Sequence, residues 1–328
     1  MRGLRIGYGR RGVAGNTPAI VAGILVAALA GMFSAAAFAA DIRILTTADG
    51  LPSNWVSALA AAPDGKLWVG TGNAGIALLD PAGKTTNVYT AKKGGLPSDE
   101  VTAVGLFEGK VYVGTAGGLA IFDGSSWEAV AQIRNVTLRN VRLAASPDGK
   151  ELWVSSVYLA GGLLRFDGRE WTFMGGEGRG LFNGVAAFAF SPEGVLLGTV
   201  SGGAYLHKGT DVLPLKEGLP PVSVFSAAAL GNRIFLGTSR GLFEWDGTRW
   251  NDVPLPEGFA RQPVFSLAAS GSDLLVAGAG GIARISGKKT TVLTVTSGLP
   301  PGKIKSLSVG GEYVAAGTPS GLAILRNW

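Results

Sequence analysis

Short runs of apolar residues, separated by turn-forming residues, fill residues 95–127 and predict four β-strands. β-Branched and aromatic residues at close spacing are typical of strands, and the pairs Glu108-Gly109 and Asp123-Gly124 are typical of tight hairpin turns. The predicted strands are Val101 to Phe107, Lys110 to Gly114, Leu119 to Phe122 and one that begins at Trp127. So small a sheet cannot cover both of its apolar faces, so we expect it to stack against copies of itself.

The same pattern recurs at a nearly constant period along the rest of the chain. The small residue that ends the second strand of each repeat recurs at steps of 44, 41, 43, 39, 41 and 39 residues. These positions are Gly70, Gly114, Ser155, Gly198, Gly237, Gly278 and Gly317. A period of about forty residues with four strands per repeat is typical of β-propellers. We therefore predict an all-β fold, a seven-bladed β-propeller of four-stranded antiparallel blades.

The seventh repeat ends at Trp328 after only three predicted strands. Residues 41–52 match residues 289–300, which form the fourth strand of the sixth repeat and the link to the seventh. We predict that Ile42 to Thr47 supplies the missing strand and closes the ring, which would also cover the sheet edges that an open array exposes.

Residues 1–39 lie outside the repeats. Four arginines precede an apolar run from Ala19 to Phe33, and Ala37-Phe38-Ala39 fits the pattern of a signal-peptide cleavage site. We predict a signal peptide over residues 1–39, with an uncleaved anchor as the alternative, and a propeller domain over residues 40–328. The protein is then expected to be periplasmic or secreted, and to meet a membrane only through its N-terminal segment.

Charge and composition exclude several kinds of function. The net charge of +6 falls to +2 without residues 1–39, and no lysine-arginine cluster remains, so no nucleic-acid partner is expected. The absence of cysteine excludes disulfides, thiolate metal sites and a cysteine nucleophile. The one histidine, His207, is expected in a solvated turn after the third strand of the fourth blade. We predict no metal, no cofactor and no histidine-based catalysis.

Two of the repeats resemble a known repeat family. The segments GLPSNWVSALAAAPDGKLWVGTGNAGIALLD and GLPSDEVTAVGLFEGKVYVGTAGGLAIFDGSSW are similar to two-component regulator propeller repeats, and the resemblance covers residues 41–328. It implies a sensor-type propeller of the WD40/YVTN-like superfamily, such as forms the extracytoplasmic sensor region of many bacterial hybrid histidine kinases. The immunoglobulin-like segment, membrane span and kinase that follow in those sensors have no counterpart here. The resemblance therefore implies ligand or partner binding, often of carbohydrates, in a stand-alone propeller without a kinase.

Candidate binding residues fall on one rim of the predicted ring, which we call the start rim because the innermost strand of each blade starts there. The link between the second and third strands lies on the same rim, whereas the opposite rim consists of repetitive tight turns. The predicted ligand-binding residues are Trp55, Asn54, Asp99, Arg139, Asn140, Tyr158, Asn183, Arg240 and Arg261. Aromatic rings beside amide and guanidinium groups suit a sugar or a polar loop of a partner. The alternative is that Trp55 folds over its own blade and the arginines are solvated.

These observations predict an exported, non-catalytic, monomeric propeller that binds a small molecule, a carbohydrate or a protein of the cell envelope. A carboxylate-based hydrolase or lyase that uses Asp99 and Glu100 is one alternative, although adjacent residues that enter a strand point to opposite sides. An assembly scaffold of the cell envelope is another.

Overall fold

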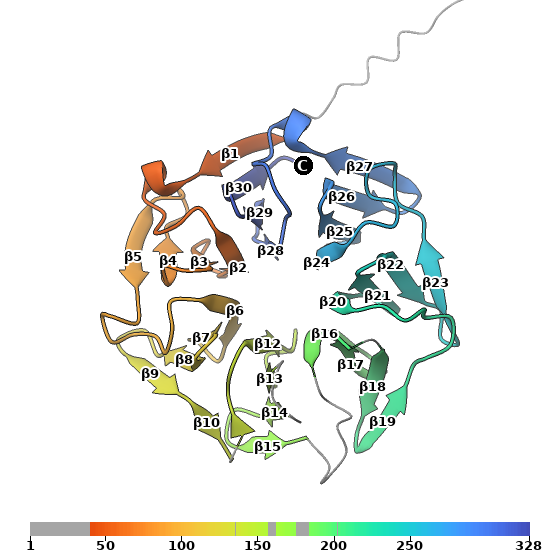
Figure 1. The fold of residues 1–328 in the computed structure, drawn as a ribbon, viewed down its shortest axis with the longest axis horizontal. Helices are drawn as coiled ribbons and strands as arrows, with labels where there is room; N and C mark the ends of the chain where they lie inside the picture. The colour runs from red at the N-terminus through yellow and green to blue at the C-terminus, as the bar shows by residue number, and fades with distance from the viewer. Residues whose placement is uncertain (1–39, 135, 157–161, 175–183, 202) are drawn as a thin grey trace, which may run out of the picture. The chain divides into compact units, whose positions relative to one another are not determined.

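A computed structural model describes residues 40–328, except for residues 135, 157–161, 175–183 and 202. In this part of the chain, the strands form seven four-stranded antiparallel sheets arranged around an axis, which confirms the predicted seven-bladed propeller (Figure 1). The described residues contain two short 3-10 helices, η1 (Thr47–Asp49) and η3 (Val295–Ser297), and no α-helix. None of their helices is long and apolar enough to cross a bilayer. The predicted signal peptide or anchor lies outside the described residues, and so do Tyr158 and Asn183.

Each blade runs from an innermost strand at the axis to an outermost strand. The first three blades are β2 (Val56–Ala61), β3 (Leu67–Thr71), β4 (Ile76–Leu79) and β5 (Thr85–Tyr89); β6 (Val101–Phe107), β7 (Lys110–Thr115), β8 (Gly118–Phe122) and β9 (Trp127–Val130); and β12 (Val141–Ala145), β13 (Leu152–Ser156), β14 (Gly162–Phe166) and β15 (Trp171–Phe173). A short hairpin that the sequence did not predict, β10 (Gln132–Ile133) with β11 (Val136–Thr137), lies in the link between blades two and three.

The remaining four blades repeat this order. They are β16 (Val185–Ser191), β17 (Gly194–Thr199), β18 (Ala204–Lys208) and β19 (Asp211–Pro214); β20 (Val224–Leu230), β21 (Arg233–Thr238), β22 (Gly241–Trp245) and β23 (Trp250–Val253); β24 (Val264–Ser270), β25 (Asp273–Gly278), β26 (Gly281–Ser286) and β27 (Lys289–Leu293); and β28 (Ser306–Val309), β29 (Tyr313–Thr318) and β30 (Gly321–Arg326), with β1 (Asp41–Leu45) as the fourth strand.

The first strand closes the ring as predicted. β1 pairs antiparallel with β30, and Ile42 lies opposite Leu325 and Leu45 opposite Leu322. The strand ends two residues earlier than expected because Thr46 caps η1, its hydroxyl accepting a hydrogen bond from the Ala48 N–H. The N-terminal and C-terminal strands of the propeller therefore share one sheet, and β1 pairs with β30 along five residue pairs within blade seven.

Neighbouring blades pack through the small residues that end the second strands. A Cβ added to Gly70, Gly198 or Gly317 would collide with a valine of the next innermost strand, so only glycine allows this close approach. The sixth blade departs from the predicted register. In blade five Gly237 pairs with Ser226, whereas at the equivalent place in blade six Ala277, and not Gly278, pairs with Ser266. The prediction of Gly278 as the register residue was wrong by one position.

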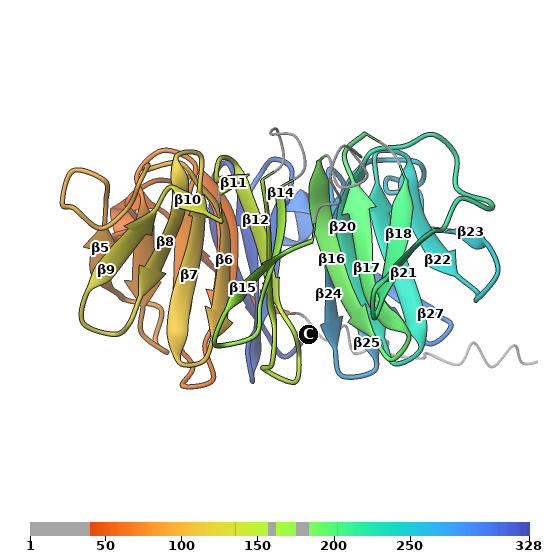
Figure 2. The ribbon, with the colours of Figure 1, turned by 90° about the horizontal axis from the view of Figure 1, so that it is seen from below.

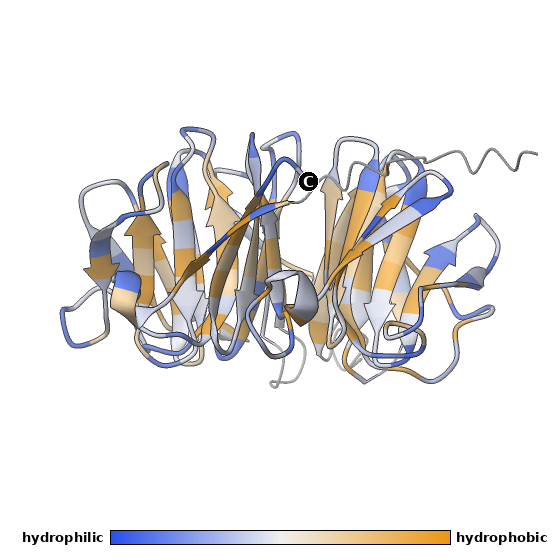
Figure 3. Ribbon diagram, turned by 90° about the horizontal axis from the view of Figure 1, so that it is seen from above, coloured by the Kyte–Doolittle hydropathy of each residue, from blue (hydrophilic) through white to orange (hydrophobic). Residues whose placement is uncertain are grey.

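The turns lie on two separate rims, as the antiparallel order requires (Figure 2). Hydrophobic bands run along the strands between the blades, whereas the turns are mostly hydrophilic (Figure 3). On the start rim, a buried threonine closes the link between the second and third strands in five blades, as when the Thr71 hydroxyl donates to the Gly75 carbonyl at 2.7 Å. The recurring Gly-Thr pair is therefore a packing and turn device.

Candidate functional site

The indole of Trp55 lies on the start rim with one face against its own blade. Ideal Cβ placement at Gly72 would come within 2.6 Å of Trp55 Cε2 and 2.8 Å of Cε3, so the ring occupies the space that any other residue at 72 would need. The Gly72 N–H also donates to the Trp55 carbonyl at 2.9 Å. Trp55 is nevertheless 43% exposed. The ring is exposed, as expected, and it also folds over its own blade, as the alternative had it.

Asn54 and Asp99 occupy equivalent positions in blades one and two and make the same hydrogen bond. The Thr47 N–H donates to Asn54 Oδ1 at 2.7 Å, and the Ala91 N–H donates to Asp99 Oδ1 at 2.7 Å. In both cases the side chain fixes the link that leads into the innermost strand. Asn54 and Asp99 therefore each have a structural role on the start rim.

The predicted residues of blades three and five are placed by backbone bonds, and their arginine side chains point to solvent. Arg139 donates its N–H to Ser156 Oγ at 3.1 Å, while Asn140, at a φ of 47°, donates to the Ala116 carbonyl of blade two. Arg240 lies next to Gly241, where an added Cβ would lie 3.9 Å from the Arg261 backbone. Arg139, Arg240 and Arg261 are exposed.

The structure brings Arg240 and Arg261 to neighbouring loops. In the described part of the chain, however, no hydrogen bond, ion pair or ring contact connects Trp55 to any of these arginines. The predicted residues therefore spread over the start rim and do not form one compact cluster.

A second set of residues on the start rim lies closer to the axis. We call it the axial collar, and it consists of the residue after the buried valine or isoleucine at the start of each innermost strand: Ser57, Thr102, Arg142, Ala186, Phe225, Phe265 and Lys305. In five blades this residue is skipped in the pairing of the first two strands, which is the geometry of a β-bulge. A bulge turns a side chain out of the strand's regular alternation, here toward the neighbouring innermost strand.

The polar members of the axial collar bond across blade boundaries. Ser57 Oγ donates to the Val101 carbonyl and Thr102 Oγ1 donates to the Val141 carbonyl, both at 2.7 Å. Arg142 Nη1 lies 3.3 Å from the Thr102 and Val141 carbonyls. These side chains therefore hold blades one, two and three together at the axis.

The remaining large members of the axial collar are Phe225, Phe265 and Lys305, which belong to blades five, six and seven. Phe225 and Phe265 stack with their centroids 5.5 Å apart and their planes 29° from parallel. Lys305, which comes just before β28, has its Nζ 5.7 Å from the centroid of Phe265, and Nζ of Lys303, two residues earlier, lies at the same distance. Both lysines are exposed and both rings are partly exposed. This group was not predicted from the sequence. The residue type at the collar position differs from blade to blade, whereas the residues on either side of it are small or apolar in every blade.

His207 does not lie in a solvated turn, so that prediction was wrong. It belongs to β18, is 6% exposed, and packs edge-on against Trp153 with the ring centroids 5.1 Å apart. Burial lowers the pKa of His207, and the nearby positive charge of Arg165 lowers it further. The residue therefore packs between blades three and four.

The described residues contain no group of three or more histidine, aspartate or glutamate side chains placed to hold a metal ion. Of the carboxylate pair Asp99 and Glu100, the first already accepts a hydrogen bond from the Ala91 N–H, and the second is exposed.

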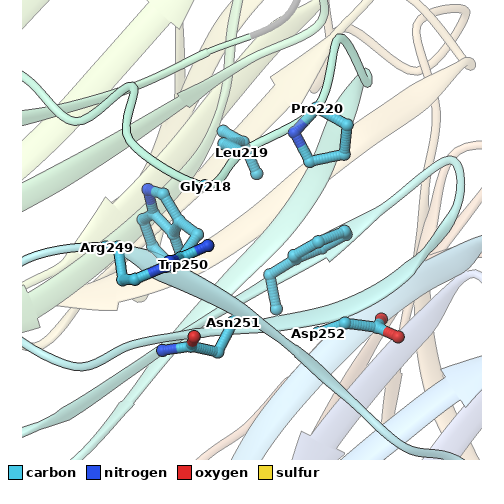
Figure 4. Close-up of a pocket in the computed structure, with 8 residues that line it drawn as sticks. Gly218, Leu219, Pro220, Arg249, Trp250, Asn251 and Asp252 are labelled. Carbon is cyan, nitrogen blue, oxygen red and sulfur yellow. The ribbon is translucent and has the colours of Figure 1, made fainter.

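The best-defined hollows lie away from the predicted residues. A depression of about 520 Å³ lies on the outer side of blade five, where Leu219 and Pro220 face Asn251 and Asp252 across it (Figure 4). Trp250 forms its floor, and the indole N–H donates to the Leu215 carbonyl at 3.1 Å. Another, of about 460 Å³, lies at the seam of β1 and β30. The first hollow lies where the link into blade five packs openly on the outermost strand β23. The N–H of the Trp250 indole already donates to Leu215 and is not free for a ligand.

One protein-family model matches part of this chain. Residues 50–73, which include Trp55 and Gly72, match the model of the family described as two component regulator propeller. This segment is therefore similar to a two component regulator propeller repeat. The match spans the link into blade one and its first two strands, so the Trp55–Gly72 contact lies within the matched segment. No curated protein sequence matches the chain.

Several solved structures are similar to this chain in fold. The extracellular domain of a protein from B. thetaiotaomicron, described as a hybrid two component system, is 18% identical with a TM-score of 0.74 over 87% of this chain and 41% of its own. A second such extracellular domain from B. thetaiotaomicron is 17% identical with a TM-score of 0.70 over 86% and 39%. A streptogramin B lyase is 13% identical with a TM-score of 0.63 over 87% and 97%. The chain thus spans about two fifths of the first two proteins, and at these identities the likeness concerns the fold alone.

Proposed function

We propose that this protein is an exported propeller that binds a ligand or partner on its start rim and catalyses no reaction. The proposal is supported by the regulator propeller repeat and by the likeness in fold to extracellular domains of two component systems. The observation that carries it is the Trp55 indole, which is held flat against Gly72 and yet is 43% exposed. A ring fixed on one face and open on the other binds with little loss of conformational entropy.

The ligand classes that suit this surface are carbohydrates and polar protein loops. Sugar rings stack on an indole face, and the exposed guanidinium groups of Arg139, Arg240 and Arg261 can donate to hydroxyl or carbonyl oxygens. Nothing in the described residues favours the hydrolase or lyase alternative, since Asp99 already holds the Ala91 N–H.

The test is a binding screen of the purified protein against a panel of oligosaccharides and against envelope extracts, read by tryptophan fluorescence and by pull-down. The comparison variant is Trp55→Ala, and the matched control is Ile44→Ala, which removes an equally exposed side chain, 41% against 43%, from the outermost strand β1. We expect Trp55→Ala to weaken binding about tenfold or more and Ile44→Ala to leave it unchanged. Equal binding by the three proteins would contradict the proposal, and capture of a single envelope protein would favour the scaffold form of it.

A further inference from the structure

Two positive charges share one aromatic ring at the axis. Lys303 Nζ and Lys305 Nζ each lie 5.7 Å from the centroid of Phe265. Each cation is attracted by the ring, but the two ammonium groups repel one another. Because both side chains are exposed, water screens part of this repulsion, but nothing in the fold requires two lysines at this place.

Among the residues that the structure describes, no acidic side chain forms an ion pair with either lysine, whereas six other ion pairs are formed elsewhere. The acidic residue at the position of blade two that corresponds to Lys303 is Glu100, and blade one separates it from blade seven. The other cation of the axial collar, Arg142, contacts backbone carbonyls of blades two and three. The repulsion between Lys303 and Lys305 would therefore be relieved by an anion from outside the chain.

A pair of phenylalanine rings lies beside the two lysines. Phe225 stacks on Phe265 at 5.5 Å, and both rings keep part of their surface exposed. Their β-bulge positions direct them out of the regular strand alternation, and neither ring belongs to the apolar core clusters of blades five and six. A ligand that reaches the lysines would also cover these rings and remove apolar surface from water.

We propose that Lys303, Lys305, Phe265 and Phe225 form a site for a small aromatic carboxylate. The carboxylate lies between the two ammonium groups, and the aromatic body lies along the phenylalanine pair. The proposal rests on the proposed binding role of the start rim and specifies a ligand class for its axial part. It involves no bond making or breaking.

The test uses three probes with the purified protein: 2-naphthoate, the uncharged 2-naphthamide, and acetate, which has the charge without the ring. We expect 2-naphthoate to bind at least about tenfold more tightly than either of the others, because it alone can use both parts of the site. Its affinity should fall as salt is raised. Equal affinities for 2-naphthoate and 2-naphthamide, or no binding of 2-naphthoate, would overturn the proposal.

Variants locate the site. The double variant Lys303→Gln/Lys305→Gln should lower the affinity for 2-naphthoate about tenfold or more, and Phe265→Leu should lower it without changing its dependence on salt. The matched control is Lys288→Gln/Lys289→Gln, which makes the same change of charge in exposed residues on the opposite rim of blade six. An equal effect of the two double variants would contradict the assignment. If 2-naphthoate fails while a ligand from the wider screen loses affinity in Trp55→Ala, the proposed function stands and only the aromatic carboxylate is wrong.

Discussion

Gly317 of the last blade lies directly against Val56 of the first: a Cβ added to Gly317 would come within 2.6 Å of Val56 Cγ1. The same contact recurs around the ring, where Gly70 faces Val101 and Gly198 faces Val224. At the seam it has a second meaning, because the two residues lie almost at opposite ends of the propeller sequence. The contact that packs any two neighbouring blades therefore also closes the ring.

We predict that Gly317→Ala destabilises the protein by about 1–3 kcal/mol, the usual cost of inserting a methyl group into a filled core. The matched control is Gly311→Ala in the same blade, where nothing lies within 4 Å of an added Cβ. Urea denaturation of the three proteins checks this. Equal stability of Gly317→Ala and Gly311→Ala would mean that the seam can open to admit the methyl group.

The closing strand allows a second comparison between adjacent residues. Leu45 is 1% exposed and packs in the core between blades seven and one, whereas Ile44 is 41% exposed on the same strand. We expect Leu45→Ala to cost about 2–5 kcal/mol and Ile44→Ala about 0.5 kcal/mol or less, measured by thermal and urea unfolding. Similar losses for both variants would show that β1 is not held in the observed register.

The ring could be predicted from the sequence because its main devices are local and repeated. The Gly-Thr pairs at the ends of the second strands, the Asp-Gly turns and the similarity of residues 41–52 to residues 289–300 each mark one place in a blade. Seven repetitions of a weak signal give a strong one. The position of Gly278 was wrong because adjacent small residues satisfy the same pattern, and only the pairing of Ala277 with Ser266 distinguishes them.

The site could be predicted only in part. Trp55 was recognisable as a large ring at a position where the other blades have small or polar residues. Its contact with Gly72 was not recognisable, because it depends on how the link before β2 packs against the link between β3 and β4. Phe225 and Phe265 were missed because a strict alternation of strand residues hides a β-bulge, which shifts one side chain out of its expected face. Lys305 was missed because it lies just before β28 begins at Ser306. The burial of His207 was missed because β18 extends past the expected turn and lies against Trp153 of the preceding blade.

Asp99 distinguishes a structural role on the start rim from a ligand contact. We predict that Asp99→Ala lowers stability by about 1 kcal/mol, because the Ala91 N–H loses its acceptor, and leaves ligand binding unchanged. Asp99→Asn keeps an acceptor oxygen and should retain most of the stability, as Asn54 does at the equivalent position. Chemical denaturation together with the binding screen checks both statements. A loss of binding in Asp99→Asn without loss of stability would restore Asp99 to the ligand site.

His207 should make the stability of the propeller depend on pH between about pH 7 and pH 5.5. Its pKa in the folded protein is lowered from the ordinary 6.5 by burial, so at mildly acidic pH the unfolded chain binds a proton that the folded protein resists. Stability contributed by the neutral ring is then complete above pH 6.5 and falls as the pH drops below it. One proton accounts for a slope of at most about 1.4 kcal/mol per pH unit.

The variant His207→Gln should weaken the dependence of stability on pH. Any other effect of the substitution should change the stability by the same amount at each pH measured. Urea denaturation of both proteins at pH 7.5, 6.5 and 5.5 measures it, and titration of the imidazole by NMR gives the folded pKa directly. Surface aspartates that accept backbone hydrogen bonds, such as Asp123 and Asp246, do not interfere, because their lowered pKa values make them titrate at more acidic pH. If the variant loses as much stability as the native protein between pH 7.5 and pH 5.5, another group is responsible, and the contact of His207 with Trp153 has no part in the response to acid.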